Sequence, residues 1–151
     1  MIVVSCLGNP GNKYRRNRHN IGFIIGSHLS SAWGIPVGKN SFSSLVGTGS
    51  VEGIDLCMMM PQTFMNNSGA AVRKVMDFYR AEPASLLVIH DDIELDFGVY
   101  KTKFGGGHKG QNGLRSIMEH LGTPDFHRFR FGVGRSDSPH LSVADHVLSD
   151  F

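Results

Sequence analysis

The stretch Ile2-Val-Val-Ser-Cys-Leu7, followed by Gly8-Asn-Pro-Gly11, decides the fold class of this chain. A short β-branched apolar run that stops at turn residues predicts a buried strand and a tight turn. Residues 20–32 then carry apolar side chains at helical spacing, and Gly34 and Pro36 stop that run. A buried strand that leads into an amphipathic helix is the unit from which α/β domains are built.

The same alternation of strands and helices continues along the chain. The further predicted elements are a hairpin over 45–51 and 54–60, helices over 68–79 and 113–121, and strands over 86–90, 99–104 and 129–133. The hairpin adds antiparallel pairs to a sheet of buried strands. We therefore expect an α/β fold, in which residues 1–151 form a single domain with a mixed, mostly parallel twisted sheet flanked by helices.

Composition excludes several classes of protein. The 151 residues are 40% hydrophobic and 19% charged, a balance that is typical of a globular domain. Cys6 and Cys57 lie in apolar stretches and form neither a disulfide framework nor a metal-binding pair, so we expect buried thiols. The N-terminus lacks a cationic segment followed by a long apolar run, which argues against a signal peptide or a membrane span. We expect a cytoplasmic protein that does not contact a membrane.

Charge is distributed unevenly although the net charge is only +2. No acid precedes Glu52, whereas five cations do: Lys13, Arg15, Arg16, Arg18 and Lys39. A second basic region lies between Lys101 and Arg135, and acids collect at positions 91, 92, 94 and 96. Two basic regions around an acidic patch favour a polyanionic partner, although solvated faces would give the same pattern.

His19 is the candidate general base. It follows a basic cluster and immediately precedes the first predicted helix, and an imidazole is largely neutral near pH 7. Asp91, at the end of the strand predicted over 86–90, is the best carboxylate to orient it. A capping or surface role for His19 is the alternative.

Three asparagines could bind an ester substrate. Asn9, Asn66 and Asn112 offer amide donors to an oxyanion without adding charge. Taken one at a time, each asparagine is explained equally well by a role in a turn or in a helix cap. Loops that follow the strands of an α/β sheet gather at one edge, so we expect these amides to meet Asp91 there.

The segment Phe104-Gly-Gly-Gly-His-Lys-Gly-Gln-Asn-Gly113 is a glycine-rich loop that leads into a helix. It could bind phosphate through backbone N–H groups, or it could be simply a flexible loop. The chain has neither a Gly-x-Ser-x-Gly nor a His-Glu-x-x-His motif. With these nucleophile and metal motifs absent, the remaining interpretation is a hydrolase in which a histidine activates water.

Six motifs in order resemble those of the bacterial peptidyl-tRNA hydrolase family, from about residue 3 to 150. They are Leu7-Gly-Asn-Pro-Gly11, Arg18-His-Asn20, Thr63-Phe-Met-Asn66 with Ser68-Gly69, His90-Asp91, Phe104-Gly-Gly-Gly-His108 with Asn112-Gly-Leu114, and Phe126-His-Arg-Phe-Arg130. The resemblance implies cleavage of the ester that joins a peptide to the 3′ ribose of tRNA, without a metal or cofactor. It implies a His19 base that Asp91 orients. The other implied residues are Asn9, Tyr14, Asn66 and Asn112 for substrate binding, and Lys103 and Arg130 as a clamp on tRNA phosphate.

The sequence departs from the family in two places. Gln111 stands where many members carry His, and Gln cannot exchange a proton near pH 7, so we expect it to position or bind substrate. The chain stops at Phe151, where relatives continue into a C-terminal helical segment. Without that segment we expect apolar surface to be exposed, at a stability cost on the order of several kcal/mol. Such a surface would make the chain marginally soluble or pair it with another chain. We expect a monomer, with self-association through the short C-terminus as the alternative.

Two other functions compete. A binding protein on the same fold would resemble the plant splicing-factor relatives of this family, but the presence of His19 and Asp91 favours an enzyme. A small-molecule hydrolase is disfavoured by the two basic regions.

Overall fold

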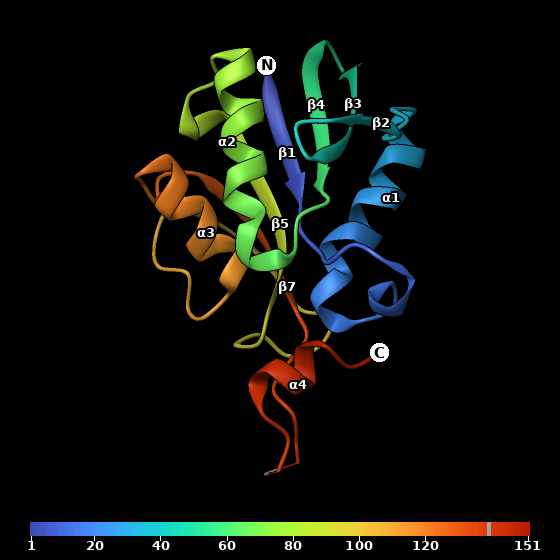
Figure 1. The fold of residues 1–151 in the computed structure, drawn as a ribbon, viewed down its shortest axis with the longest axis vertical. Helices are drawn as coiled ribbons and strands as arrows, with labels where there is room; N and C mark the ends of the chain where they lie inside the picture. Colours follow the sequence, from blue (N-terminus) through green and yellow to red (C-terminus); the bar gives the residue numbers. More distant parts are fainter. Residues whose placement is uncertain (139) are drawn as a thin grey trace.

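Seven strands form one sheet in the order β2-β3-β4-β1-β5-β7-β6 (Figure 1). The computed structural model describes residues 1–138 and 140–151. The strands are β1 (Ile2–Cys6), β2 (Lys39–Ser41), β3 (Ser44–Val51), β4 (Ile54–Pro61), β5 (Leu86–Asp92), β6 (Tyr100–Phe104) and β7 (His127–Gly132). The helices are α1 (Ile21–Trp33), α2 (Ser68–Tyr79), α3 (Asn112–Leu121) and α4 (Val143–Val147), and single 3-10 turns include η1 (Asn12–Tyr14), η2 (Arg18–Asn20) and η3 (Met65–Asn67).

The centre of the sheet is parallel, as the buried apolar strands predict. β1 pairs with β4 and β5, and β5 pairs with β7, all in parallel. β2 runs in the same direction, whereas β3 and β6 oppose it. The predicted α/β domain with a mixed, mostly parallel sheet is confirmed.

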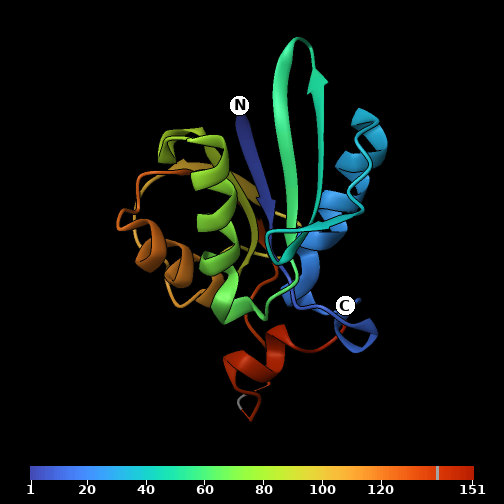
Figure 2. The ribbon, with the colours of Figure 1, turned by 45° about the horizontal axis from the view of Figure 1, so that its top comes forward.

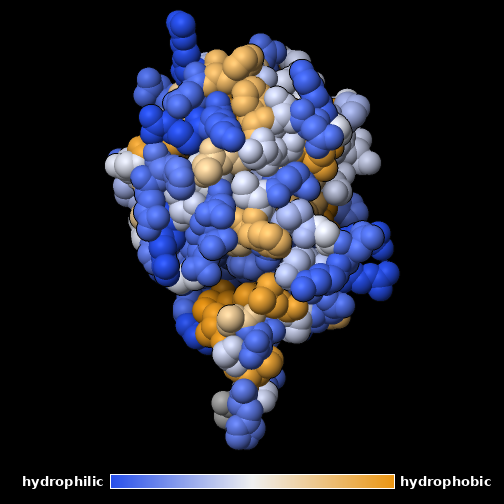
Figure 3. Space-filling view, in the orientation of Figure 1, coloured by the Kyte–Doolittle hydropathy of each residue, from blue (hydrophilic) through white to orange (hydrophobic). Residues whose placement is uncertain are grey.

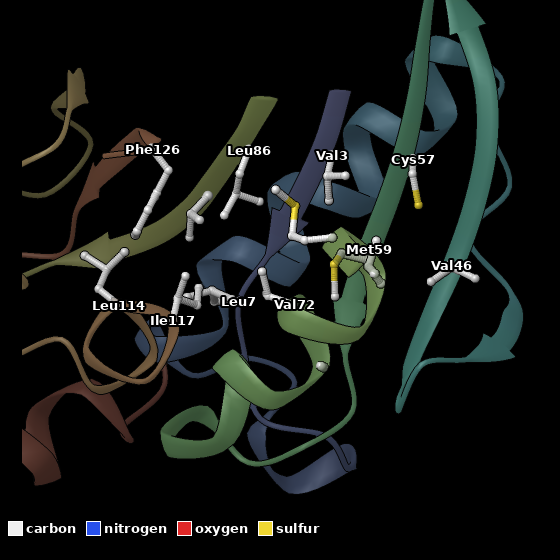
Figure 4. Close-up of a cluster of buried hydrophobic side chains, with 14 of the residues drawn as sticks. Val3, Leu7, Val46, Cys57, Met59, Val72, Leu86, Leu114, Ile117 and Phe126 are labelled. Atoms are coloured by element: carbon white, nitrogen blue, oxygen red, sulfur yellow. The ribbon is translucent and has the colours of Figure 1, made fainter. Parts of the chain in front are cut away.

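Helices cover both faces of the sheet (Figures 1 and 2). α2 and α3 pack on one face over a cluster that includes Val3, Met59, Val72 and Ile117, part of which Figure 4 shows. α1 packs on the other face against a second cluster from alternate positions of the same strands, among them Val4, Cys6, Met58 and Ile89. Cys6 and Cys57 are buried free thiols, as predicted, and burial raises the pKa of Cys6 to about 12.

Glycine allows two helices to pack more closely than larger residues would. A Cβ at Gly22, in the first turn of α1, would overlap the backbone oxygen of Leu7 and would lie 2.6 Å from that of Ile89. A Cβ at Gly69 in α2 would overlap the backbone of Ser116 in α3. The contact at Gly22 therefore holds the start of α1, next to His19, directly against the ends of β1 and β5.

Most predicted elements agree with the structure to within two residues, and the differences have local causes. β5 runs to Asp92 because Asp91 and Asp92 pair with β7, so Asp91 lies in the strand and not in the following loop. The sequence analysis missed the short elements β2 and α4. The strand β6 was predicted, but its antiparallel pairing with β7 was not. Among the described residues, no helix has the length and apolar character needed to cross a membrane.

Candidate active site

A cavity of about 390 Å³ opens at the edge of the sheet where β1, β4 and β5 end. Its lining combines every catalytic and substrate-binding residue predicted from the sequence: Asn9, Tyr14, His19, Asn66, Asp91, Gln111 and Asn112. Phe64, Met65, Asp92, Ile93, His108, Lys109, Gly110, Val143, Ala144, Val147 and Leu148 complete it. The fold thus brings Asn9, Asn66, Asp91 and Asn112 together at one edge of the sheet, as expected.

His19 and Asp91 form a buried pair in this cavity. His19 Nδ1 donates to Asp91 Oδ2 at 2.7 Å, and the residues are 8% and 2% exposed. A carboxylate on Nδ1 fixes the proton on that nitrogen and leaves the lone pair on Nε2. The arrangement is therefore that of a histidine able to accept a proton at Nε2.

Gln111 holds the second oxygen of the same carboxylate. Its Nε2 donates to Asp91 Oδ1 at 2.9 Å, and its Oε1 accepts from the backbone N–H of Leu114 at 2.8 Å. Gln111 is thus also the N-cap of α3. A single side chain connects the start of that helix to the carboxylate that contacts His19.

Asn9 is held by hydrogen bonds to two neighbouring segments. Its Oδ1 accepts from the backbone N–H of Met65 at 2.7 Å. Its backbone N–H donates to Asn20 Oδ1, and Asn20 Nδ2 donates back to the backbone oxygen of Asn9, both at 2.8 Å. Within the described residues, the Nδ2 group of Asn9 has no protein acceptor, so it is available as a donor to a ligand.

The other predicted substrate residues lie on the rim. Asn66, in the middle of η3, and Asn112, the first residue of α3, are exposed, and neither caps its helix. Tyr14 is half-buried and makes an edge-to-face contact with Phe64, with ring centroids 6.3 Å apart. Two amides and an aromatic pair therefore frame the opening.

One wall of the cavity is apolar and comes from α4. Val143, Ala144, Val147 and Leu148 line it, and Figure 3 shows apolar side chains gathered around this helix. Val147 also packs against Ile21 at the start of α1. The sequence analysis missed this wall, although Ser142 three residues before Asp145 is a capping signal, and the Ser142 hydroxyl accepts from the Asp145 N–H.

The predicted clamp residues, Lys103 and Arg130, lie beside the main cavity. They line a small adjoining hollow with Lys109 and Arg128, and Asp92 lies in the lining of both spaces. Arg130 Nε donates to Asp92 Oδ2 at 2.8 Å, and its side chain is only 14% exposed. A phosphate bound here would therefore share Arg130 with Asp92.

The electrostatics of this hollow follow from burial and pairing. Burial alone would raise the pKa of Asp92, but hydrogen bonds from Arg130 and from the backbone N–H of Glu94 lower it below its usual range. His90 donates from Nδ1 to the backbone oxygen of Asp91, and burial lowers the pKa of His90 so that it stays neutral. Three of the four acids in this region are thus paired: Asp91 binds His19 and Asp92 binds Arg130 inside the protein, and Glu94 binds Arg135 at the surface.

Arg128 is a residue that the sequence analysis did not single out. It is 1% exposed, and its guanidinium donates to the backbone oxygens of Gly106, Gly107 and Pro124 at 2.6 to 2.9 Å. Burial lowers the pKa of Arg128. This side chain fixes the glycine-rich loop, which Gly105 begins.

A buried histidine–carboxylate pair, surrounded by amides at one edge of an α/β sheet, is typical of an enzyme that works by proton transfer. No group of three His, Cys, Asp or Glu side chains in ranges 1–138 and 140–151 is arranged to hold a metal ion. Fold and site together define an α/β enzyme whose cavity holds a buried histidine–carboxylate pair.

Comparison with known proteins narrows this class. Residues 2–151 match the family model described as peptidyl-tRNA hydrolase. The chain is 49% identical over 149 residues to the peptidyl-tRNA hydrolase of Geobacter metallireducens, covering 99% of this chain and 76% of that protein. It is 44% identical over 151 residues to that of Brevibacillus brevis, covering 100% and 79%.

The fold agrees as well. The crystal structure of peptidyl-tRNA hydrolase from Acinetobacter baumannii superposes with a TM-score of 0.94 at 40% identity, covering 100% of this chain and 76% of that one. The chain belongs to the peptidyl-tRNA hydrolase family. The matches support hydrolysis of peptidyl-tRNA as its activity.

Proposed function

We propose that this chain hydrolyses the ester bond of peptidyl-tRNA with a water molecule that His19 activates. The observation that carries the proposal is the 2.7 Å contact between His19 Nδ1 and Asp91 Oδ2, inside a cavity framed by amides. That contact leaves Nε2 of His19 as the proton acceptor, in the same cavity as Asn9, Asn66 and Asn112.

The reaction follows from this geometry in two steps. His19 Nε2 takes a proton from water while the oxygen attacks the ester carbonyl, and Asp91 stabilises the imidazolium that forms. Amide donors, among them Asn9 Nδ2, bind the oxyanion of the tetrahedral intermediate. The intermediate collapses as His19 returns the proton to the departing ribose oxygen, which releases a peptide acid and a tRNA with a free hydroxyl.

The cationic side chains beside the cavity suit a phosphate of the tRNA that lies against the protein surface. We assign Lys103 and Arg130 to this contact, with Asp92 keeping the Arg130 guanidinium in place before binding. Lys103→Ala should weaken binding of peptidyl-tRNA and flatten its salt dependence, by about 0.7 to 0.9 in the logarithmic slope for one phosphate contact. An unchanged slope would remove Lys103 from the clamp.

The decisive experiment measures release of labelled peptide from peptidyl-tRNA. His19→Ala should lower kcat by about 10²- to 10⁴-fold, the usual contribution of a general base. His28→Ala, an exposed histidine on α1, is the matched control and should leave the rate unchanged. Equal rates for His19→Ala and the unaltered protein would remove His19 from the mechanism, and binding of tRNA without turnover would favour a binding protein.

The mechanism uses only side chains and water, so we propose that it needs no metal or other cofactor. Prolonged treatment with a chelator should leave the rate of peptide release unchanged, whereas a fall in rate that added metal restores would contradict the proposal. We further propose that the protein acts as a cytoplasmic monomer.

A further inference from the structure

Three exposed cations surround a residue of the cavity rim. Lys13, Arg15 and Arg16 flank Tyr14, which lines the cavity. None of the three makes an ion pair with a described residue. We call Lys13, Arg15 and Arg16 the basic arm. No acid occurs within the first 51 residues, and the carboxylate of Asp150, at the border of the arm, accepts from Asn17.

The basic arm is held in place on both sides. Within it, the Tyr14 N–H donates to Gly11 and the Asn17 N–H donates to Tyr14, at 3.2 and 2.9 Å. From a segment distant in sequence, the Phe151 N–H donates to the backbone oxygen of Arg16 at 3.2 Å, and Asn17 Nδ2 donates to Asp150 Oδ1 at 2.7 Å. The backbone that carries the three side chains therefore needs little ordering on binding.

The neighbouring Arg18 has a different role. Its Nη1 donates to the hydroxyl of Ser149 at 2.9 Å and to the backbone oxygen of Asp150 at 2.6 Å. Arg18 is thereby committed to holding residues 149–151 beside the arm. The four cations of residues 13–18 thus divide into Arg18, which binds residues 149 and 150, and the three of the arm, which make no ion pair with a described residue.

The arm lies across the cavity from the glycine-rich loop. In Figures 1 and 2 the segment that follows β1 and the loop before α3 lie on opposite sides of the carboxyl ends of β1 and β5. Tyr14 in the arm and Lys109 in the loop both line the same cavity. The cavity therefore has cationic side chains on two of its sides.

We propose that Lys13, Arg15 and Arg16 bind backbone phosphates of the tRNA outside the cavity, on the side opposite Lys103 and Lys109. The proposal rests on peptidyl-tRNA being the substrate. Phosphates carry the negative charge of any RNA, and three exposed cations on a fixed backbone match a short run of them. The arm would anchor the nucleic acid, while the cavity holds the ester.

The test compares two substrates of one variant, Lys13→Ala/Arg15→Ala/Arg16→Ala. With peptidyl-tRNA, KM should rise by about tenfold or more near physiological salt, and the logarithmic salt slope of kcat/KM should become shallower by about 0.7 for each phosphate that the variant no longer binds. With an N-acetyl-aminoacyl ester of adenosine, which carries no phosphate, kcat/KM should stay unchanged.

A matched control removes three exposed cations, none of which adjoins a residue of the cavity lining: Lys39, Lys74 and Arg80. An equal change in salt slope for this control, or an unchanged slope for the arm variant, would overturn the proposal. A fall in kcat/KM on the adenosine ester equal to that on tRNA would also overturn it, because the arm would then act on the reaction centre. Failure of the hydrolase proposal would appear separately, as absence of turnover by the unaltered protein.

Discussion

Asp91 is fixed from two directions, and this distinguishes it from a carboxylate with one partner. His19 occupies Oδ2 and Gln111 occupies Oδ1. Gln111 also binds the start of α3 through Leu114, so its amide cannot rotate without breaking both hydrogen bonds. The orientation of the imidazole at position 19 therefore depends on a neutral side chain that does not titrate.

Gln111→Glu tests this dependence. The new carboxylate keeps an acceptor for the Leu114 N–H but faces Asp91 with like charge, which raises the proton affinity of the pair. We expect kcat to fall by about tenfold or more at pH 8 and to recover partly toward pH 6, where a shared proton restores the hydrogen bond. A pH–rate profile with the shape of the unaltered protein's would contradict this role.

Asp92 should make stability depend on pH. Its pKa lies below the ordinary value of 3.8 in the folded protein, so its ionised form stabilises the fold above that pH. The contribution is lost as pH falls through the lowered folded-state pKa. Asp92→Asn should reduce the free energy of unfolding at pH 7 by roughly 1.5–3 kcal/mol. In denaturant titrations, the difference from the unaltered protein should shrink below about pH 4; a constant difference would exclude this origin.

Residue identity indicated the His19–Asp91 contact but not the contacts that support it. A histidine after a basic cluster and a carboxylate at a strand end suggested this pair, the family resemblance favoured it over a capping role for His19, and the two side chains are 2.7 Å apart in the structure. The exchange of hydrogen bonds between Asn9 and Asn20 was not predictable, because it needs the turn after β1 to fold back on η2. The engagement of Arg130 by Asp92 depends in the same way on the pairing of β5 with β7.

At the scale of elements, α1 places the histidine of the site. The helix begins two residues after His19, and the absence of a side chain at Gly22 lets its first turn contact the ends of β1 and β5. A helix displaced at this point would carry His19 away from Asp91.

Gly22→Ala should therefore damage both stability and catalysis. The added methyl group overlaps backbone atoms, so we expect a decrease of about 1–3 kcal/mol in unfolding free energy and a lower kcat. Gly38→Ala is the control, because a Cβ there meets nothing within 4 Å. Thermal denaturation and peptide release would be measured on both variants. Equal behaviour of the two would show that the close approach at Gly22 is dispensable.

Periodicity predicted the long elements and failed where an element is short or its direction matters. Apolar spacing defined α2 to the residue, because one face of that helix packs on the sheet. The two elements that escaped prediction have three and five residues, too few to establish a period. β6 is antiparallel to β7, so the carboxyl end of β6 lies away from the cavity. The glycine-rich loop that follows β6 then leads back to the cavity, where Asn112 begins α3. The position of Asn112 near the other amides was predicted correctly, but for the wrong reason.

For the whole molecule, exposed aromatic side chains gather on the outer face of β6 and β7 and on the loop before β6. Tyr100 stacks on Phe129 with ring centroids 5.3 Å apart, and Phe97 contacts Phe131 and Phe151. Phe97, Tyr100 and Phe104 are each more than half exposed, at 66%, 64% and 52%. A grouped aromatic surface of this kind favours association between molecules.

We expect the unaltered chain to be monomeric when dilute and to self-associate as its concentration rises. Tyr100→Thr/Phe104→Thr should reduce the association in sedimentation velocity, because threonine keeps the strand and removes the rings. Phe78→Thr is the comparison, since Phe78 is 64% exposed on α2. A monomer at every concentration, or an equal effect of Phe78→Thr, would contradict the assignment to this face.

The hydrogen bonds between residues 16–18 and 149–151 have a consequence for biosynthesis. The segment that leads into His19 is made early, but its backbone partners and the apolar wall of α4 follow every strand of the sheet in sequence. A nascent chain that has emerged from the ribosome as far as the end of β7 can complete the sheet, but it still lacks the wall of the active-site cavity that α4 supplies. Enzymatic competence should therefore appear abruptly once residues 143–151 have emerged, well after the sheet has folded.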